Sequence, residues 1–120
     1  LVCAPGGKVG EVGQADLIQP SDIDRMSAYA TTAQFYGFKL IYLEAGSGAK
    51  TPVSPDLIRS ARDSCNLTIV VGGGIRDAQT ARIASKAGAD WIVTGNLAEE
   101  YDNADELQEI LTKFISDMNQ

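Results

Sequence analysis

Four short apolar segments recur along the chain, and patterns typical of helices separate them. These segments are Leu1 to Ala4, Leu40 to Leu43, Leu67 to Val71 and Trp91 to Val93. Apolar strands that alternate with helices indicate βαβ units, in which right-handed crossovers join parallel strands that are buried on both faces. The sequence therefore predicts an α/β fold with four parallel strands that alternate with helices.

Each helical segment carries local start or stop signals. The expected capping residues at the helix starts are Ser21, Ser54, Asp77 and Asn103. For the last of these, Glu106 is the expected capping-box partner. Glycines at 37 and 88 are expected to end the first and third helices. The apolar residues expected on buried helix faces include Ile23, Ile83 and a stripe from Leu107 to Met118. The segment from Pro5 to Gly13 is expected to be a glycine-rich loop.

Composition and charge narrow the classes of function. The 120 residues suit one domain, and 44% of them are hydrophobic, which allows a modest core. The formal net charge is −6, and Lys and Arg are spread along the chain, which argues against nucleic acid or an anionic membrane as the main partner. Histidine is absent and Cys3 lies far from Cys65, which argues against zinc sites and His-based triads.

No apolar run approaches the roughly 20 residues that cross a bilayer, so we expect a soluble protein in a reducing, cytoplasmic setting. The chain opens on an apolar run at Leu1 without an initiator Met, which indicates a chain cut at its N-terminus. Four strand-helix units make half of an eight-stranded TIM barrel, which typically needs about 250 residues. We therefore expect residues 1–120 to be a single partial domain, the C-terminal half of a phosphate-binding (βα)8 barrel. A small open sheet is the alternative.

Glycines follow two neighbouring predicted strands. Gly72-Gly73-Gly74 ends one apolar run and Gly95-Asn96 ends the next. Main-chain N–H groups can hold a phosphate when no Cβ blocks the approach, and carboxyl ends of parallel strands meet at one edge of a sheet. The pattern predicts a phosphate cradle, which the segment from Leu97 to Tyr101 would complete as a short extra helix. The structural alternative is that the glycines serve tight turns only.

A carboxylate also ends a predicted strand. Glu44 follows an apolar run, where burial is costly unless a polar ligand or hydrogen bonds satisfy the charge. Tyr42 lies two residues earlier and so shares its face of the strand. The alternative is a surface Glu44 paired with Lys39 or Lys50.

Two further residues, Arg76 and Trp91, can be explained without a ligand. Arg76 stands at a helix start, where a solvated arginine is as good an interpretation as an anion ligand. Trp91 is interpreted most simply as a strand side chain that packs against a helix or a neighbouring subunit, with ligand contact as the alternative.

Three motifs in this order and spacing, YLEAGSG, VGGGIRD and AGADWIVTGN, resemble the C-terminal half of the archaeal-type geranylgeranylglyceryl phosphate synthases and the related bacterial heptaprenylglyceryl phosphate synthases. The loop PGGKVGEVGQA also resembles the family, so the similarity covers nearly the whole chain. YLEAGSG is its specific part, because VGGGI and TGN occur in many phosphate-binding barrels.

The resemblance implies a prenyltransferase. In this family the sn-3 hydroxyl of sn-glycerol 1-phosphate attacks C1 of a polyprenyl diphosphate such as geranylgeranyl diphosphate, and diphosphate leaves with Mg²⁺ assistance. Glu44 would be the catalytic residue, as the general base. The implied substrate-binding residues are Tyr42, Leu43, Glu44, Ala45, Gly46, Ser47, Gly48, Gly73, Gly74, Gly95 and Asn96.

This chain differs from the family pattern in one respect. The metal-binding aspartate of the family lies near its first strand, so no residue of this chain is assigned as a metal ligand, and the fragment alone is expected to be inactive. Family members commonly form dimers or larger assemblies, which implies a homo-oligomer for the complete protein. Two other functions stay open: another phosphate-binding barrel, such as a histidine-biosynthesis isomerase, and a non-catalytic half barrel that binds phosphate.

Overall fold

The computed structural model describes residues 1–119 and contains one three-stranded parallel sheet. The strands are β1 (Leu40–Glu44), β2 (Thr68–Gly72) and β3 (Trp91–Val93), in the order β1-β2-β3. Tyr42 lies opposite Val70, and Val70 lies opposite Trp91. The α/β class with a parallel sheet is therefore confirmed.

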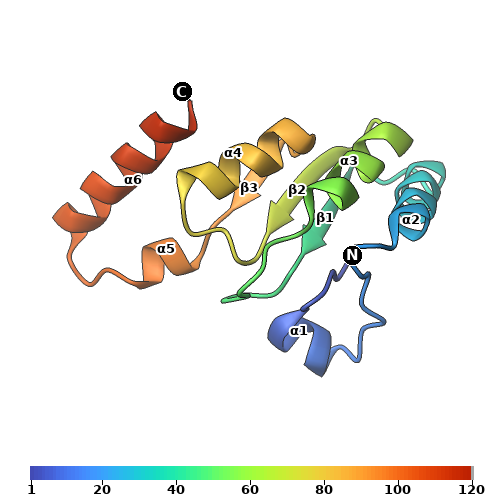
Figure 1. The fold of residues 1–120 in the computed structure, drawn as a ribbon, viewed down its shortest axis with the longest axis horizontal. Coiled ribbons are helices and arrows are strands. Elements are labelled where there is room, and N and C mark those ends of the chain that lie inside the picture. Colours follow the sequence, from blue (N-terminus) through green and yellow to red (C-terminus); the bar gives the residue numbers. More distant parts are fainter. Residues whose placement is uncertain (120) are drawn as a thin grey trace.

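Helices lie mainly along one side of this sheet. Figure 1 shows α2, α3 and α4 in a row, with α6 beyond α4 and α1 near the N-terminus. The helices of the described chain are α1 (Gly7–Val12), α2 (Ile23–Phe35), α3 (Pro55–Ser64), α4 (Ala78–Ala87), α5 (Asn96–Glu99) and α6 (Ala104–Met118). The short helix expected over Leu97 to Tyr101 is thus present as α5, with shifted bounds.

The predicted first strand, Leu1 to Ala4, is not a strand of the described sheet. Val2 forms an isolated parallel bridge with Glu44, and Cys3 forms another with Ile18. The Cys3 N–H donates to the Glu44 carbonyl at 2.8 Å. Because Glu44 is the last residue of β1, this segment has no further strand to pair with there. Its next N–H, at Ala4, donates to the Ile18 carbonyl instead.

The expectation of a loop from Pro5 to Gly13 is also wrong, because its centre forms α1. Two of its glycines allow close packing: a Cβ on Gly10 would lie 3.0 Å from the Leu17 side chain, and one on Gly7 would lie 3.0 Å from the Gly46 backbone. Glycine lowers intrinsic helix propensity, so packing against the neighbouring loops stabilises this helix.

Most of the predicted N-cap residues cap their helices in the structure. The Ser54 hydroxyl accepts from the Asp56 N–H, and the Asp77 carboxylate accepts from the Thr80 N–H at 2.7 Å. Asn103 caps α6 through the Asp105 N–H, and no capping-box bond from Glu106 is found within residues 1–119. Helix α2 begins one residue later than expected, with Asp22 at the N-cap position in place of Ser21.

Gly37 ends α2 as predicted. It has a φ of +81°, its N–H donates to the Gln34 carbonyl, and the Phe38 N–H donates to the Ala33 carbonyl. These two bonds form a Schellman motif, whose left-handed residue favours glycine.

Replacing Asp77 with Ala should lower the free energy of unfolding of the full-length protein by about 1 kcal/mol, because the first turn of α4 loses its side-chain acceptor. Urea denaturation followed by circular dichroism measures this loss. Replacing the exposed Asp63 with Ala removes the same charge without an N-cap and serves as the control. Equal stabilities of the two variants would contradict the capping role.

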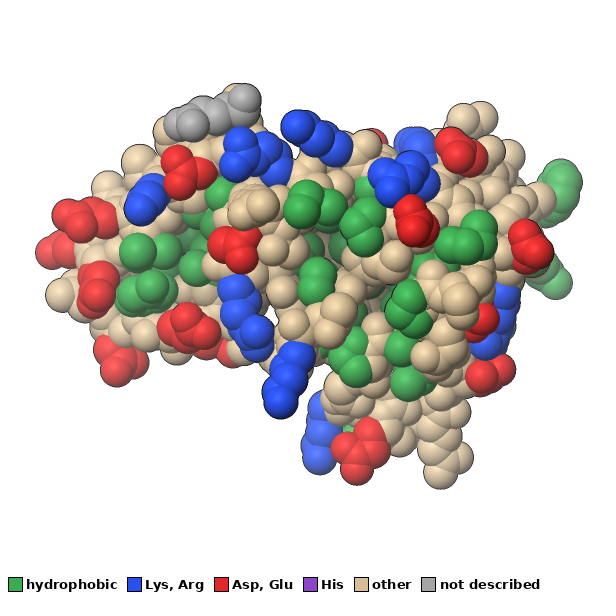
Figure 2. Space-filling view, in the orientation of Figure 1, with side chains coloured by type: hydrophobic (Ala, Val, Ile, Leu, Met, Phe, Trp, Pro, Cys, Tyr) green, Lys and Arg blue, Asp and Glu red, His purple; other side chains and the backbone are tan. Residues whose placement is uncertain are grey.

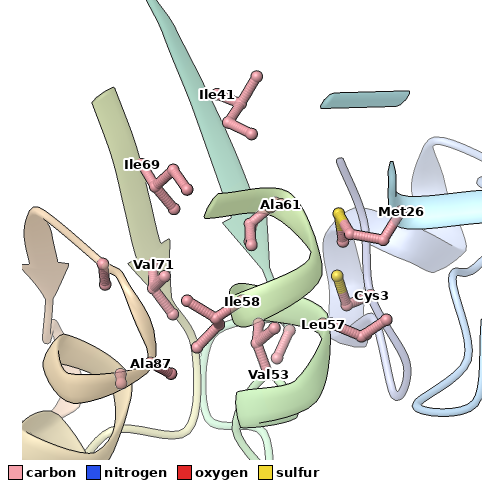
Figure 3. Close-up of a cluster of buried hydrophobic side chains, with 14 of the residues drawn as sticks. Cys3, Met26, Ile41, Val53, Leu57, Ile58, Ala61, Ile69, Val71 and Ala87 are labelled. Atoms are coloured by element: carbon pink, nitrogen blue, oxygen red, sulfur yellow. The ribbon is translucent and has the colours of Figure 1, made fainter. Parts of the chain in front are cut away.

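The core lies between the sheet and helices α2 to α4. Figure 3 shows Ile41, Ile69 and Val71 projecting from β1 and β2 on the side where Ile58 and Ala61 of α3 lie. All five side chains are buried. Alternating strand positions therefore hold this face of the sheet against the helices.

On the opposite face of the sheet the outer strands are largely uncovered, so the expectation of strands buried on both faces is wrong for β1 and β3, whereas Ile69 to Gly72 of β2 are all buried. Trp91 keeps 65% of its surface exposed, Val93 keeps 43% and Leu40 keeps 49%. No helix within residues 1–119 therefore covers most of the Trp91 side chain. A parallel sheet with one bare apolar face is unusual, because crossover helices normally cover both faces.

Three predicted burials on helices also fail. Ile23 and Ile83 are exposed, because α2 and α4 bury their small residues instead, among them Ala30, Ala33, Ala81 and Ala84. No residue of α6 is buried, since this helix packs mainly on α4 and its stripe from Leu107 to Met118 is only half covered.

Acidic side chains gather at the end of the visible face where α6 lies, and charges of both signs are interspersed over the rest (Figure 2). The five salt bridges in the described residues are mostly at the surface, where such pairs contribute little to stability. None of the helices in residues 1–119 is long and apolar enough to cross a membrane.

Candidate functional site

The loops after β1, β2 and β3 meet at one edge of the sheet and enclose a small pocket of about 120 Å³. Pockets for drug-sized ligands measure about 300–1,000 Å³, so this one suits a small molecule. Its lining residues are Tyr42, Glu44, Ser47, Gly73, Gly74, Ile75, Val93, Thr94, Gly95 and Asn96.

Seven of the predicted binding residues line this small pocket, and Leu43, Ala45, Gly46 and Gly48 do not. Leu43 and Ala45 are fully buried, and Leu43 belongs to the core on the helix side of the sheet. Gly46 and Gly48 belong to the loop that carries Ser47 but do not line the pocket. Ile75, Val93 and Thr94 line it without having been predicted; Thr94 directly precedes the Gly95-Asn96 signal and donates to the Ile75 carbonyl at 2.8 Å.

Glu44 lies at the centre of the site. Its Oε1 accepts a hydrogen bond from the Gly46 N–H at 2.6 Å. Within the described residues it forms no salt bridge, so pairing with Lys39 or Lys50 is not observed. One carboxylate oxygen is thus held by the backbone, which leaves the group oriented toward the pocket that it lines.

Tyr42 shares this face of β1, as period-two spacing predicts. A Cβ on Gly72 would overlap the Tyr42 hydroxyl, so the phenol occupies space that the absence of a side chain on Gly72 leaves free. Burial raises the pKa of Tyr42 to about 12, and the neighbouring Glu44 carboxylate adds to the shift. The phenol therefore stays protonated at neutral pH and can donate a hydrogen bond.

Each glycine of the triplet makes room for a different neighbour. A Cβ on Gly73 would lie 2.6 Å from Glu44 Oε1 and 2.7 Å from the Gly46 nitrogen. A Cβ on Gly74 would lie 3.0 Å from the Ala49 oxygen and from the Pro52 nitrogen. Gly73 and Gly74 have φ values of +86° and +73°, which other residues rarely adopt. Close packing of the loops, and not an anion alone, accounts for these glycines.

Seven main-chain N–H groups at the pocket are unpaired. In the hydrogen bonds found among residues 1–119, the N–H groups of these pocket-lining residues have no acceptor: Ser47, Gly73, Gly74, Ile75, Thr94, Gly95 and Asn96. They come from the loops after all three strands. Such a set of unpaired donors is the usual means by which backbone binds an anion.

Gly48 is the point where the loops are joined. Its N–H donates to Oδ1 of Asn96 at 3.0 Å, and its carbonyl accepts from Nη2 of Arg76 at 3.0 Å. The Asn96 side chain is thus engaged with the protein itself. No local pattern around Arg76 predicts this contact, because it depends on the path of another loop.

A large hollow of about 500 Å³ adjoins the small pocket and shares Tyr42, Glu44 and Ser47 with it. Apolar side chains and one cation complete its lining: Leu1, Val2, Val9 and Lys8. Glu44 therefore faces a small polar pocket on one side and a larger, mainly apolar space on the other.

The side chains of the described residues do not suit a magnesium ion. Among residues 1–119, no three His, Cys, Asp or Glu side chains lie close enough together to hold a metal. These residues therefore do not fit a metal centre.

Comparison with known proteins identifies relatives along nearly the whole chain. The model of the PcrB family matches residues 1–114. A curated relative from Thermoplasma volcanium, named geranylgeranylglyceryl phosphate synthase, is 52% identical over 103 residues, which are 86% of this chain and 41% of that protein. The chain thus spans less than half the length of this relative.

Two solved structures share the fold. Wild-type GGGPS from Thermoplasma volcanium has a TM-score of 0.89 at 44% identity, over 98% of this chain and 46% of its own. The geranylgeranylglyceryl phosphate synthase of Thermoplasma acidophilum, solved in complex with its substrate sn-glycerol-1-phosphate, has a TM-score of 0.86 at 41% identity. Here 96% of this chain matches 47% of the solved one.

Proposed function

This chain belongs to the PcrB family, and on that premise we propose that it forms the glycerol-phosphate-binding half of a geranylgeranylglyceryl phosphate synthase. The observation that carries the proposal is the small pocket, where unpaired N–H groups from three loops surround one oriented carboxylate. A relative that is 41% identical was solved with sn-glycerol-1-phosphate, a ligand of matching size and chemistry.

In the proposed complex the phosphate binds the N–H groups of Ser47, Gly74 and Gly95-Asn96. Hydrogen bonds to charged groups are each worth about 1.5–3 kcal/mol, so several convergent donors hold a phosphate without any lysine or arginine in the small pocket. The protonated phenol of Tyr42 is a further donor. The glycerol then extends toward Glu44.

Glu44 orients the glycerol and acts as general base. It accepts the proton of the sn-3 hydroxyl while the oxygen of that hydroxyl attacks C1 of the polyprenyl diphosphate. The new C–O bond forms as the bond between C1 and the diphosphate oxygen breaks, and diphosphate leaves with that electron pair. The negative carboxylate also stabilises positive charge that develops at C1. Holding the alcohol beside C1 supplies much of the acceleration.

The prenyl diphosphate lies in the large hollow beside Glu44. Support comes from the size of the hollow, its mainly apolar lining by Leu1, Val2 and Val9, and its shared wall with the small pocket. Magnesium, which the family resemblance implies, would assist the leaving diphosphate. We assign none of its ligands to the described residues, which do not fit a metal site.

We further propose that the sheet is half of a (βα)8 barrel within a single partial domain. Its bare face, with Trp91, Val93 and Leu40 exposed, is the apolar surface that a barrel interior would bury. Residues Tyr42 and Glu44 lie on that same face, at the carboxyl ends of the strands where barrel active sites form. The complete protein is proposed to be a cytoplasmic homo-oligomer.

Titration calorimetry of the full-length protein tests the function. We expect sn-glycerol 1-phosphate to bind at least about tenfold more tightly than its mirror image, sn-glycerol 3-phosphate, because one charged hydrogen bond to Glu44 is lost with the wrong enantiomer. Inorganic phosphate is the control for the phosphate contacts alone. Equal affinity for the two enantiomers would contradict the proposed role of Glu44 in binding.

The PcrB match favours the prenyltransferase over a histidine-biosynthesis isomerase, for which YLEAGSG has no explanation. The other alternative, a non-catalytic phosphate-binding half barrel, predicts binding without turnover. Assay of the full-length protein with sn-glycerol 1-phosphate, geranylgeranyl diphosphate and Mg²⁺ separates the two, since only the synthase forms the ether and releases diphosphate.

A further inference from the structure

The main chain of Gly48 forms hydrogen bonds with side chains from two other loops. Arg76 lies between β2 and α4, and its guanidinium donates to the Gly48 carbonyl at 3.0 Å. Asn96 follows β3, and its Oδ1 accepts from the Gly48 N–H at 3.0 Å. Both polar groups of a single residue are therefore satisfied from two separate loops.

Gly48 lies in a tight turn that carries a proposed anion donor. The Ala49 N–H donates to the Gly46 carbonyl at 3.1 Å, and Gly48 has a φ of +70°, the conformation that the third residue of a type II turn requires. Ser47, whose N–H is unpaired within residues 1–119, is the second residue of this turn. Ser47 and Gly48 thus belong to one turn, so contacts that hold Gly48 also hold the segment that carries the Ser47 N–H.

Arg76 and Asn96 add to two other contacts between the three loops: the Thr94 hydroxyl donates to the Ile75 carbonyl at 2.8 Å, and Gly73 and Gly74 pack against the loop after β1. The available N–H groups of these loops can bind one phosphate together only when all three loops keep their relative positions. Arg76 and Asn96 fix the first loop to the second and to the third through the same residue. Neither contact needs a ligand, because both exist in the protein alone.

We propose that Arg76 and Asn96 are positioning residues that form a joint on Gly48 and pre-organise the phosphate-binding loops. The inference rests on the proposed function, because it assigns the joint to the glycerol-phosphate site. Pre-organisation improves affinity by removing the cost of ordering the loops on binding. Weakening the joint therefore raises Kd and KM for glycerol phosphate and leaves kcat unchanged.

An alternative role for Arg76 is attraction of the phosphate by its charge. The two roles differ in their dependence on salt, because an exposed charge is screened at high ionic strength whereas a hydrogen-bonded joint is not. Asn96 carries no charge, so its replacement tests the joint free of that effect. Asn96→Ala keeps the main-chain N–H that is proposed to bind phosphate.

The experiment uses the full-length protein with the variants Asn96→Ala and Arg76→Met, and Lys86→Met as the control. Lys86 is exposed at the far end of α4, so its replacement removes one charge away from the joint. Calorimetry with sn-glycerol 1-phosphate at low and high salt gives Kd. Amide hydrogen exchange of the protein without ligand reports the joint directly at the Gly48 N–H.

Each joint variant should raise Kd roughly 2- to 10-fold, the effect of one net hydrogen bond, at both salt concentrations. Asn96→Ala should speed Gly48 exchange by a similar factor, whereas Lys86→Met should match the wild type. The loss of binding free energy in the double variant should be smaller than the sum of the losses in the two single variants, because both side chains act on Gly48. Arg76→Lys, which keeps one donor, should recover part of the affinity.

Unchanged Gly48 exchange and unchanged Kd in Asn96→Ala would overturn the joint. If the increase in Kd of Arg76→Met disappears at high salt, Arg76 attracts the phosphate by its charge and does not position the loops. If the wild-type protein fails to bind sn-glycerol 1-phosphate, the proposed function fails instead, and Gly48 exchange still decides whether the joint exists.

Discussion

Replacing Glu44 with Gln in the full-length protein should lower kcat for ether formation by about 10²- to 10⁴-fold, the usual contribution of a general base. The amide retains an oxygen that can accept the Gly46 N–H, so the local loop contact survives. What disappears is the group that takes the proton of the attacking hydroxyl and stabilises charge at C1. The loss should therefore appear mainly in kcat.

A steady-state assay with geranylgeranyl diphosphate and sn-glycerol 1-phosphate measures this change. Glu109→Gln is the matched control, because it removes the same charge from the exposed surface of α6, outside both the small pocket and the large hollow. Its kcat should equal that of the wild type. Turnover in Glu44→Gln at the wild-type rate would reject the general-base role, and calorimetry would show whether Glu44 still contributes to binding.

The helices of α3 and α4 could be predicted because their signals are local. Ser54 with Pro55 and Asp77 with Gly88 mark helix ends through hydrogen bonds and backbone angles that span only a few residues. Helix α1 has no such signal. Its glycines weaken the helix, and only contacts with distant loops reveal why it forms.

Burial was harder to predict than secondary structure. Ile83 fits a helical pattern as well as Ala81 and Ala84 do, but α4 buries the small side chains instead. A helical pattern of apolar residues defines a stripe on the helix surface, but it does not show which part of that stripe contacts a neighbouring element. The exposure of Trp91 could not be predicted for the same reason, because the sequence of a strand does not show which element covers its face.

The site could be predicted in outline from strand geometry. Parallel strands place their carboxyl ends together, and the period of two puts Tyr42 and Glu44 on one face, where both line the small pocket. The same period assigns Leu43 and Ala45 to the other face, where the structure buries them. The contacts of Arg76 and Asn96 with Gly48 join residues 28 and 48 positions apart, which no local pattern encodes.

The strongest effect on binding without loss of a polar side chain is expected from Gly73→Ala. An alanine there meets two obstacles: a φ of +86°, and a Cβ that would lie 2.6 Å from Glu44 Oε1 and 2.7 Å from the Gly46 backbone. The left-handed conformation alone costs roughly 1–2 kcal/mol. The contact adds to this cost, because relieving it moves Glu44 or the loop after β1.

Gly37→Ala separates these two effects. Gly37 has a similar φ of +81°, but a Cβ there meets no atom within 4 Å. It should lower the free energy of unfolding by about 1 kcal/mol and leave Kd for sn-glycerol 1-phosphate unchanged. Gly73→Ala should be less stable than Gly37→Ala in urea denaturation and should raise Kd by more than about tenfold, since at least one charged hydrogen bond to the ligand is misplaced.

The comparison decides what the second glycine of the triplet does. If both variants lose the same stability and bind glycerol phosphate equally well, Gly73 serves only its backbone angle, and the tight-turn interpretation is sufficient. If Gly73→Ala alone loses binding, the bare Cα is needed to let the loops approach Glu44. The order of the two Kd values therefore separates turn geometry from the construction of the binding site.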